Sequence, residues 1–484
     1  MTIEALLSEN KDLKTENASL RFRLEQLERL VFGSKSERTV TMELPGQLGL
    51  FSRDDVEQMP DLPQEKESIA YERTKKGHNG RNALPGHLPV REVTMEPEED
   101  TQGMKKIGEE VTETLEYTPA SLVRVRTIRP KYAKNDGGGI VIAPLPERPI
   151  DKGIAEAGLL AHILVSKYVD HLPLYRQAKI FKRDFGWDPA TSTLGDWMSG
   201  CCQLLEPLYN RLKQKILALG YIQADESPIK VLECDKKGSS HQGYQWVYHD
   251  PVQKLVLFNY RKGRGQHGPK ELLAGYTGYL QCDGYTVYDK IGQDLKITLA
   301  GCLVHARRKF HEAKDGDPQR AKRALDLFAD IYVLEKEIKG QNPGHEGTRA
   351  RRNEKILPLL LEIKHWIETE SVKVLPKSPM GKAMAYFLNQ WPKFANIFTD
   401  GRIQLDNNLI ENAIRPLALG RKNYLFAGSH KAAQNAAMLY SFFGSCKMQG
   451  INPTQWLTDT LQRLPGHSIQ KLDGLLPGHQ KDGV

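Results

Sequence analysis

The chain has 484 residues, a net charge of +8 at pH 7 and a sequence pI of about 8.9. Its hydrophobic share of 39% and charged share of 26% exclude a wholly disordered chain, and its length predicts about two to four structural units with one large core. The mild basic excess favours a polyanionic partner such as nucleic acid without requiring one.

Composition also indicates the cellular compartment in which the protein is expected. No apolar stretch is long enough to cross a bilayer, so no membrane partner is expected. The six cysteines are scattered and form no C-x-x-C pair, which favours a reducing compartment over a disulfide framework. The chain turns polar directly after its first residues, so we expect no signal peptide and a cytoplasmic protein.

Residues 1–33 carry a seven-residue repeat that predicts a leucine-zipper-like coiled coil. Leucines fill one apolar position, and two asparagines stand at central sites of the other, which favours a parallel two-stranded arrangement. These positions are Leu6, Leu13, Leu20 and Leu27, and Ile3, Asn10, Asn17, Leu24 and Val31. Flanking residues of opposite charge, such as Glu9 and Lys14, would pair across two chains. We therefore expect a homodimer or higher oligomer; the alternative is a single amphipathic helix lying on its own domain.

Two segments of different character follow. Residues 34–86 are polar and contain Pro, Gly, Glu and Lys throughout, which predicts a flexible linker. Residues 87–150 predict a small β-rich basic domain, because apolar and basic residues partly alternate over 115–132 before a glycine turn. The apolar residues are Val123, Val125 and Ile128, the basic ones Arg124, Arg126, Arg129 and Lys131, and the turn Gly137, Gly138 and Gly139. Such a hairpin would present one basic face, which either contacts the DNA backbone or is simply solvated.

Residues 151–220 are expected to be helical. The apolar spacing predicts helices over 159–167 and 174–185, another beginning near residue 188, and a further one over 204–219. A helix, a short turn and a helix rich in small polar residues are compatible with a helix-turn-helix DNA-binding motif, and equally with ordinary helix packing.

Five apolar runs after these helices predict an α/β layer. They are residues 222–225, 244–248, 255–260, 279–282 and 297–303. The first run ends on Asp225, where Pro228 would block continuation of the strand, and the fourth leads to Asp283. A basic helix is expected over 305–313, and helix-period patterns over 318–400 predict a helical insertion.

The two aspartates suggest a metal site. The hairpin between their strands could leave those strands side by side in one sheet, so Asp225 and Asp283 can converge. Converging carboxylates repel each other and require a cation, and oxygen-only ligands favour Mg²⁺ or Mn²⁺. Two such ions can activate a water or a 3′-hydroxyl and stabilise the departing oxygen of a phosphodiester.

A third carboxylate would come from a helix after the insertion, and Glu411 is the candidate. Arg415 shares its helix face and could hold Glu411 or grip a phosphate. Pro416 would end this helix early, and Arg421 and Lys422 follow as a basic patch.

Alternative roles exist for these residues. Glu411 stands at capping-box spacing from Asn408 and could only cap its helix, or form a plain surface pair with Arg415. Glu226 and Asp294 are rival carboxylates.

Other chemistries fit less well. His305 and His311 lack a matched pair of ligands for zinc, and the sequence contains no phosphate-binding P-loop. Residues 261–268 form a glycine-rich basic loop, which either embraces DNA or is a mobile surface loop.

Seven motifs carry a family resemblance. In chain order they are VFGSKSER (31–38), HLPVRE (87–92), KYVDHLPLYR (167–176), ADESP (224–228), QCDGY (281–285), CLVHARRKF (302–310) and ENAIRPLALGRKN (411–423). With these motifs the sequence resembles transposases of the insertion-sequence-66 family, a bacterial group of DDE transposases, over nearly the whole chain.

The resemblance implies a ribonuclease-H-like catalytic domain in which Asp225, Asp283 and Glu411 are the catalytic residues and metal ligands. It also implies an N-terminal leucine zipper followed by a zinc-finger-like region. Residues 87–150 of this chain contain no cysteine, so we expect a degenerate version of that region and no bound zinc.

The expected function is that of a transposase, which binds the terminal inverted repeats of its insertion sequence and catalyses metal-dependent DNA cleavage and strand transfer. The expected partners are those repeats, the target DNA and accessory proteins of the same element. The expected DNA-binding residues are Arg415, Arg421 and Lys422, with Arg307, Arg308 and Lys309. A ribonuclease-H-like nuclease or resolvase, and an inactive DNA-binding relic, are the alternatives.

The expected fold class is α/β, and the chain is expected to divide into seven parts. They are the coiled coil (1–33), linker (34–86), degenerate zinc-finger-like domain (87–150), helical region (151–220), ribonuclease-H-like catalytic domain (221–317 and 401–445), helical insertion (318–400) and C-terminal helical region with its tail (446–484).

Overall fold

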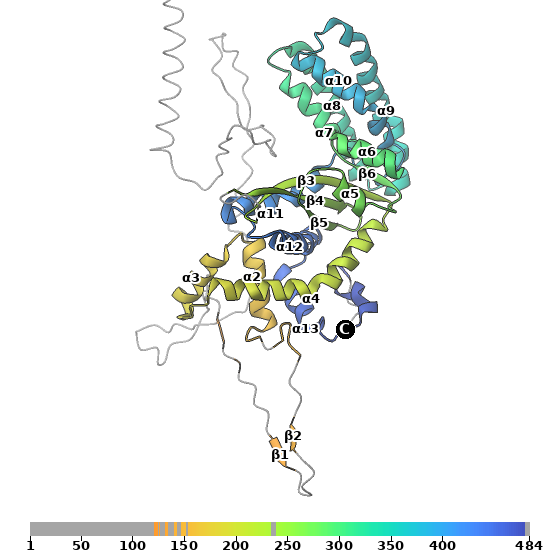
Figure 1. The fold of residues 1–484 in the computed structure, drawn as a ribbon. Coiled ribbons are helices and arrows are strands. Elements are labelled where there is room, and N and C mark those ends of the chain that lie inside the picture. Colours follow the sequence, from red (N-terminus) through yellow and green to blue (C-terminus); the bar gives the residue numbers. More distant parts are fainter. Residues whose placement is uncertain are drawn as a thin grey trace, which may run out of the picture. The chain divides into compact units, whose positions relative to one another are not determined.

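The computed structural model describes the second part of the chain (Figure 1). The described residues are 121–123, 125, 131–133, 140–142, 147–151, 153–233 and 239–479. The predicted coiled coil and linker, residues 1–86, lie outside them, and so does most of the predicted basic domain.

A small hairpin is present in the basic domain. Strand β1 (Lys131–Ala133) pairs antiparallel with β2 (Ile140–Ile142), so the two strands flank the predicted glycine turn. The strands begin later than the alternating pattern indicated, because Val123 and Val125 belong to no strand and are 72% and 67% exposed. The arginines of the predicted basic face lie outside the described residues.

Three helices precede the main sheet: α2 (Ala157–Tyr168), α3 (Leu174–Phe185) and α4 (Thr191–Leu217). The predicted bounds of α3 are confirmed, and Gly186 ends it with a left-handed φ of 66°. The prediction of two further helices is wrong, because α4 runs unbroken through both. Pro207 removes one intrahelical hydrogen bond, but the carbonyl it leaves belongs to the exposed Gln203, where water can satisfy it.

The main sheet has five strands in the order β5-β4-β3-β6-β7. They are β3 (Tyr221–Val231), β4 (His241–Asp250), β5 (Leu255–Arg261), β6 (Tyr279–Gln281) and β7 (Thr298–Ala300). Strands β3, β4 and β5 are antiparallel neighbours, whereas β6 runs parallel to β3 and β7 parallel to β6. The expectation that the two aspartate-bearing strands are neighbours is confirmed. Helices α5 (His267–Leu272) and α6 (Thr286–Leu295) occupy the connections after β5 and β6.

Strand β3 does not end at Asp225, so that prediction is wrong. The strand continues through Pro228, which pairs with Tyr244 of β4. The carbonyl of Pro228 accepts a hydrogen bond from Arg421, and that of Lys230 accepts one from Ala427. The main-chain groups of these alternate residues therefore face away from β4, and the missing N–H of the proline removes no bond from the β3–β4 ladder.

One face of the sheet is covered by helices from both ends of the described chain. Helix α12 (His430–Gln449) lies between the sheet and α4, and α13 (Pro453–Arg463) packs on α2 (Figure 1). A short 3₁₀ helix, η2 (Ile469–Leu475), contacts α4. These helices and the sheet share one apolar core.

The hydroxyl groups of α12 complete the edge of the sheet. The N–H groups of Val256 and Phe258, on the outer strand β5, donate to the buried Ser445 and Ser441 at 2.9 and 2.7 Å. The edge of β5 is therefore covered and unavailable for pairing with another strand.

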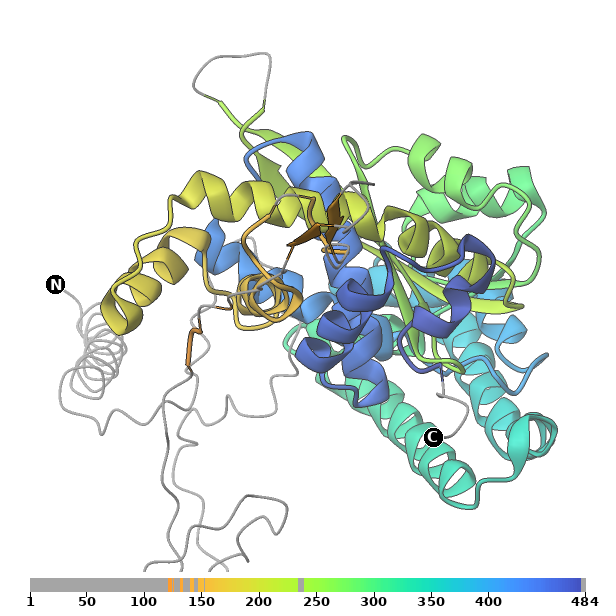
Figure 2. The same ribbon diagram turned by 90° about the horizontal axis from the view of Figure 1, so that it is seen from below.

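The predicted helical insertion is helical and has an apolar core of its own. After α7 (Leu303–Glu312) it consists of α8 (Pro318–Gly340), α9 (Gly344–Glu370), a 3₁₀ turn η1 (Ser371–Lys373) and α10 (Pro379–Asn396). Figure 2 shows α8 and α9, coloured green to cyan, running beside each other. Among the described residues, no helix is both long and apolar enough to traverse a lipid bilayer.

Candidate active site

The sheet brings two aspartates together. Gln223 of β3 pairs with Gln281, the last residue of β6. Asp225 lies two residues further along β3, and Asp283 lies two residues beyond the end of β6. Because side chains on a strand alternate between faces, Asp225 lies on the same face of β3 as Gln223. Asp283 follows β6 at the same offset from Gln281, and its charge acts on Asp225. Burial raises the pKa of Asp225 well above its ordinary value, and the charges of Glu226, Asp283 and Glu411 raise it further.

Glu411 is the third carboxylate of this group. It stands in the first turn of α11 (Asn408–Tyr424), and its side chain is 12% exposed. Burial raises its pKa, the charges of Asp406 and Asp283 add to that rise, and the charges of Arg308 and Arg415 oppose it. The structure thus brings the three predicted carboxylates within electrostatic reach of one another.

Two expectations about α11 are wrong. Pro416 does not end the helix, which continues to Tyr424 because its buried face runs on through Leu417 and because the carbonyl freed by the proline belongs to the exposed Asn412. The capping alternative for Glu411 also fails, since the N-cap is Asn407 and the N–H of Asn408, at the start of the helix, donates to Asp406 instead.

The rival carboxylates are held by other groups. Glu226 accepts hydrogen bonds from Arg264 at 2.7 and 2.9 Å and from the Tyr288 hydroxyl at 2.9 Å. Arg264 also stacks on the ring of Tyr285, 4.2 Å from its centroid. Asp294, on α6, pairs with Lys270 at 2.6 Å and is largely exposed.

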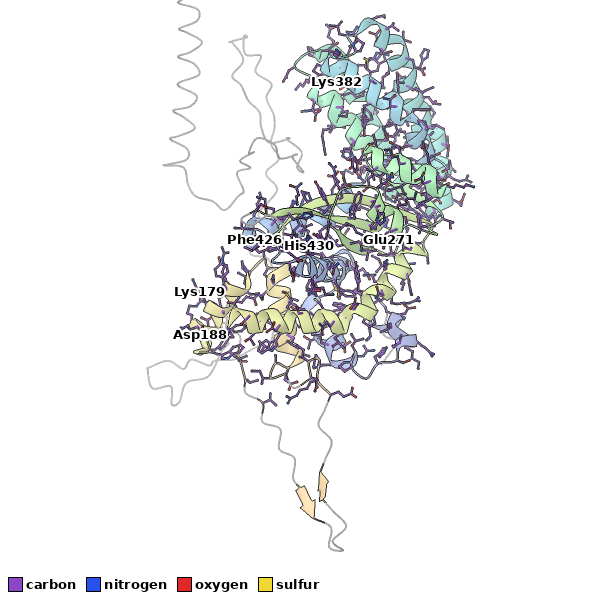
Figure 3. The ribbon with its side chains drawn as sticks, viewed as in Figure 1. Lys179, Asp188, Glu271, Lys382, Phe426 and His430 are labelled. Carbon is purple, nitrogen blue, oxygen red and sulfur yellow. The ribbon has the colours of Figure 1, made fainter. Side chains whose placement is uncertain are left out.

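The glycine-rich basic loop is therefore attached to the site. Its Arg264 binds the residue next to Asp225, which the sequence pattern did not reveal. The same loop lines an open cleft of about 410 Å³ together with His430 and Gln434 at the beginning of α12. Phe426 and His430 mark this end of α12 in Figure 3, where Ala427 forms a bridge with the end of β3.

The predicted basic residues divide into two groups, and the first lies beside the carboxylates. Arg308 is close enough to Glu411 for its charge to oppose the rise in the pKa of that carboxyl, and Arg415 acts in the same way. His305, which sequence reasoning considered only for zinc, lies 3.9 Å from a Glu411 oxygen through its Nε2.

The second group is directed elsewhere. The Lys309 ammonium lies over the Tyr386 ring, 5.0 Å from its centroid. Arg421 donates to the Pro228 carbonyl, and burial lowers the pKa of this guanidinium. Arg307 and Lys422 are exposed.

The three carboxylates have the ligand chemistry that a hard divalent cation prefers. Asp225, Asp283 and Glu411 offer only carboxylate oxygens, the ligands that Mg²⁺ and Mn²⁺ prefer. Their mutual repulsion raises the pKa of Asp225, and a cation among them would offset that repulsion. Within the described part of the chain, however, no three His, Cys, Asp or Glu side chains are grouped closely enough to hold an ion as they stand.

Sequence reasoning also missed the buried polar groups beneath the carboxylates. Gln223 and Gln281 are 0% exposed, and Tyr221 is nearly so. The one sequence signal for them is their shared offset, since each glutamine precedes an aspartate of the site by two residues.

Four family models match this chain, over the candidate site, the C-terminal region and the N-terminal part. A family model described as "Transposase IS66 family" matches residues 152–435, which contain all three carboxylates, and one described as "IS66 C-terminal element" matches 441–477. A model described as "Transposase C of IS166 homeodomain" matches 19–93, and one described as "zinc-finger binding domain of transposase IS66" matches 99–133. Residues 99–133 contain neither cysteine nor histidine in this chain, so they lack the usual zinc ligands.

Full-length relatives occur in Sinorhizobium fredii. Uncharacterized protein y4jD is 32% identical over 504 residues, covering 99% of this chain and 98% of the relative. Uncharacterized protein y4qI is 32% identical over 501 residues (99% and 92%), and uncharacterized protein y4hP is 30% identical over 499 residues (96% and 89%).

Proposed function

Because the chain belongs to the IS66 transposase family, we propose that it binds the terminal inverted repeats of its insertion sequence and catalyses metal-dependent DNA cleavage and strand transfer. The observation that supports this proposal is the mutual electrostatic effect of three carboxylates that come from separate parts of the chain. Asp225 is on β3, Asp283 follows the neighbouring parallel strand β6, and Glu411 is on a helix 128 residues beyond the second aspartate. The strand arrangement supports a ribonuclease-H-like domain, since three antiparallel strands are continued by two parallel strands on the far side of the first.

Asp225, Asp283 and Glu411 are the residues that would hold Mg²⁺ or Mn²⁺. When bound, such ions lower the pKa of a coordinated water or hydroxyl and stabilise the oxygen that leaves phosphorus. Glu226 is kept apart from this task by Arg264 and Tyr288.

The reaction has two steps at phosphorus. Water attacks the phosphodiester at the element end, the bond from phosphorus to the 3′-oxygen breaks, and a free 3′-hydroxyl remains. That hydroxyl then attacks a phosphodiester of the target DNA and displaces its 3′-oxygen. Arg308 and Arg415, whose charges already act on Glu411, would bind the phosphate beside it. Arg421 would act through β3, whose main chain it contacts, and Lys422, Arg307 and Lys309 would contact the DNA backbone.

The remaining parts of the chain fit this activity. The coiled coil in residues 1–33 would pair two protomers, as two element ends require, and residues 87–150 would add a DNA contact without zinc. The catalytic domain would comprise 221–317 and 401–445, interrupted by the helical insertion at 318–400. This function places the protein with DNA in the cytoplasm, where accessory proteins of the same element could join it.

The test is Asp283→Asn in the full-length protein, with Asp294→Asn as its matched control. Asp294 is a largely exposed carboxylate on the next helix, paired with Lys270. The DNA is a duplex carrying the inverted repeats that flank the gene, incubated with Mg²⁺. We expect Asp283→Asn to abolish cutting while leaving end binding intact, and Asp294→Asn to cut normally. Undiminished cutting by Asp283→Asn would refute the assignment, and products that are cut but never joined would favour a nuclease or resolvase.

A further inference from the structure

The segment between the insertion and α11 is irregular in structure yet runs through the interior. Over residues 401–407 buried and half-buried residues alternate, as in an extended chain, without pairing as a strand. Buried main-chain groups require hydrogen-bond partners, and in this segment neither a helix nor a ladder supplies them.

Every carbonyl from residue 402 to residue 406 has a donor. The side chain of Gln404 donates to the Arg402 carbonyl at 3.1 Å, and the N–H of Leu303 donates to the Leu405 carbonyl at 3.0 Å. The other three carbonyls, of residues 403, 404 and 406, are satisfied by side chains from distant parts of the chain.

Two of these side chains are the glutamines beneath the aspartates. Gln281 Nε2 donates to the Gln404 carbonyl at 2.8 Å, and Gln223 Nε2 donates to the Asp406 carbonyl at 3.1 Å. The glutamines are joined to each other at 3.0 Å, and Gln281 also accepts from the Tyr221 hydroxyl at 2.6 Å. That hydroxyl accepts in turn from the Gln404 N–H at 3.1 Å.

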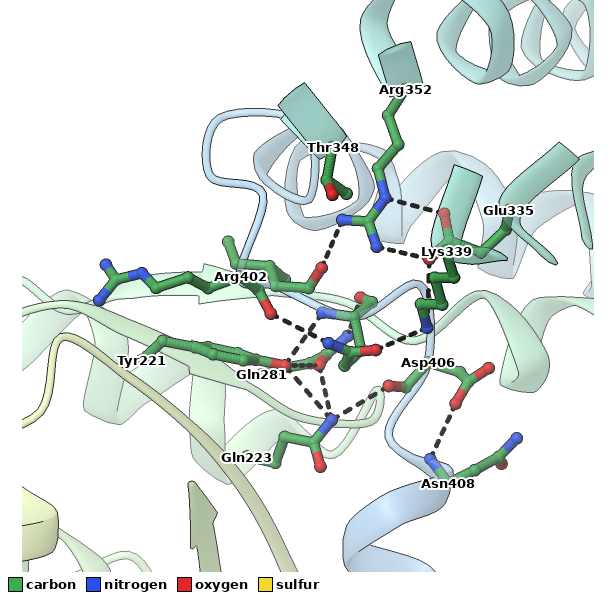
Figure 4. A network of polar contacts seen from close by, with 12 residues as sticks. Tyr221, Gln223, Gln281, Glu335, Lys339, Thr348, Arg352, Arg402, Asp406 and Asn408 are labelled. Carbon is green, nitrogen blue, oxygen red and sulfur yellow. Dashed lines mark hydrogen bonds and ion pairs between the residues drawn. The ribbon is translucent and has the colours of Figure 1, made fainter. Parts of the chain in front are cut away.

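The third side chain comes from the helical insertion. Arg352 of α9, 0% exposed, donates to the Ile403 carbonyl and forms a short ion pair with Glu335 of α8. Lys339 donates to the Gln404 side chain at 2.7 Å. Figure 4 shows Tyr221, Gln223 and Gln281 on one side of the segment and Arg352, Glu335 and Lys339 on the other.

We propose that Gln223 and Gln281 are positioning residues that hold Glu411 at the two aspartates, and that Arg352 ties the helical insertion to the same segment. The inference rests on the proposed function of the three carboxylates. Helix α11 starts directly after the segment, since the Asn407 carbonyl accepts from the N–H groups of Ile410 and Glu411. The glutamines thus fix the start of α11 from β3, which carries Asp225, and from β6, which leads to Asp283.

Glutamine suits this task for a chemical reason. A buried amide is expensive unless its groups are paired, and an apolar side chain would fill the same space. Gln281 uses both its oxygen and its nitrogen twice, donating to the carbonyls of Gly301 and Gln404. This side chain therefore specifies where the segment lies, which apolar packing alone would not do.

The test compares Gln281→Met with Gln245→Met in the full-length protein. Gln245 is equally buried in the same sheet, but its amide donates to the Ala433 carbonyl of α12 at 2.9 Å. Each variant loses a buried amide, and only Gln281→Met loses contact with the segment leading to Glu411.

For Gln281→Met we expect cleavage of the inverted-repeat duplex to fall about 10- to 100-fold, as is typical when a group that supports a metal ligand is removed. The Mg²⁺ concentration for half-maximal cleavage should rise, and binding of the duplex should not change. Amide hydrogen exchange over residues 402–411 should quicken in Gln281→Met and stay at the wild-type rate in Gln245→Met, whose cleavage should also stay near wild type.

If Gln281→Met does not fold, Tyr221→Phe removes a single hydroxyl from the same network and should change the same quantities in the same direction, by less. Equal exchange over 402–411 in both methionine variants would overturn the positioning role. A wild-type protein that fails to cut would instead refute the proposed function, and the exchange comparison would still decide whether the glutamines hold the segment.

Discussion

Helix α12 and the segment 402–407 both lie against the central sheet, and they are attached to it by different means. In α12 the main-chain hydrogen bonds are satisfied within the helix, so the helix offers the sheet a surface of mostly apolar side chains. The segment has no helical bonds of this kind. The carbonyl of Arg402 takes its donor from the Gln404 side chain, and the carbonyls of the next four residues, 403 to 406, take donors from outside the segment. Regular structure can be placed by shape alone, whereas a buried irregular segment requires particular polar side chains around it.

The side chains that donate to or support the segment are buried as well as polar. Tyr221, Gln223, Gln281 and Arg352 are inaccessible to solvent and all serve the segment side of the sheet. Substitution of such residues is costly, because removing one partner of a hydrogen bond leaves the other buried and unsatisfied. The cost in the free energy of unfolding is about 1–3 kcal/mol, and more for a charged group. The segment side should therefore be the more sensitive to single substitutions.

The largest effect should come from Arg352→Met. This substitution leaves the buried Glu335 without its arginine and the Ile403 carbonyl without a donor. We expect a loss of about 3–5 kcal/mol in the free energy of unfolding, measured by urea denaturation. The control is Arg349→Met on the same helix, whose exposed pair with Glu346 should be worth less than about 1 kcal/mol. Equal losses in the two variants would remove the distinction between buried and exposed contacts.

A somewhat smaller effect should appear as a pH dependence. His249 is buried beside Gln223, to whose oxygen its Nδ1 donates at 3.2 Å, and burial lowers its pKa from 6.5 to about 4. The unfolded chain binds a proton near pH 6.5 and the folded chain only near pH 4, so folding should lose stability as the pH falls between these values. The shift corresponds to about 3 kcal/mol.

The measurement is the free energy of unfolding of wild type and His249→Asn across that pH range. The free energy of unfolding of His249→Asn should fall less than that of the wild type as the pH is lowered. The control His267→Asn, at a highly exposed histidine, should show the same pH dependence as the wild type. Parallel curves for wild type and His249→Asn would contradict the assignment of this pH dependence to His249.

The smallest effect should come from the α12 side. Ser441→Ala leaves the N–H of Phe258 on the covered edge of β5 without its acceptor. We expect a loss of about 1–3 kcal/mol in the free energy of unfolding, because the other contacts of α12 with the sheet, including the bonds from Val256 to Ser445 and from Gln245 to Ala433, are unchanged. Ser468→Ala, at an exposed serine that precedes η2 and whose side chain makes no capping hydrogen bond, should stay within about 0.5 kcal/mol. A loss as large as that of Arg352→Met would show that α12, too, depends on single polar contacts.

Much of the architecture could be predicted from sequence patterns. The predictions about prolines that were wrong share one cause. The strand spacing predicted that the strands leading to Asp225 and Asp283 are neighbours, as found. The errors at Pro228 and Pro416 arose because a proline was expected to end its element. In each case the lost hydrogen bond falls where it costs little, and that position depends on tertiary structure.

The polar surroundings of the site could not be predicted in the same way. The donors to the segment act on main-chain carbonyls, which every residue possesses, so no pattern of residue types marks them. Gln223 and its acceptor Asp406 are separated by 183 residues, and Arg264 and Glu226 by 38. The carboxylates were recognisable because their chemistry requires particular side chains at spacings that sequence motifs preserve.

The separation between the glutamines and the segment also has a consequence for the order of folding. Contacts between Gln281 and residue 404, and between Gln223 and residue 406, close loops of 123 and 183 residues around the whole insertion. Closing such loops is entropically costly, and contacts of this kind form slowly. A growing chain contains both aspartates long before Glu411 has been synthesised, so the three carboxylates can assemble only after the whole insertion has been synthesised and the segment that follows it has reached the sheet.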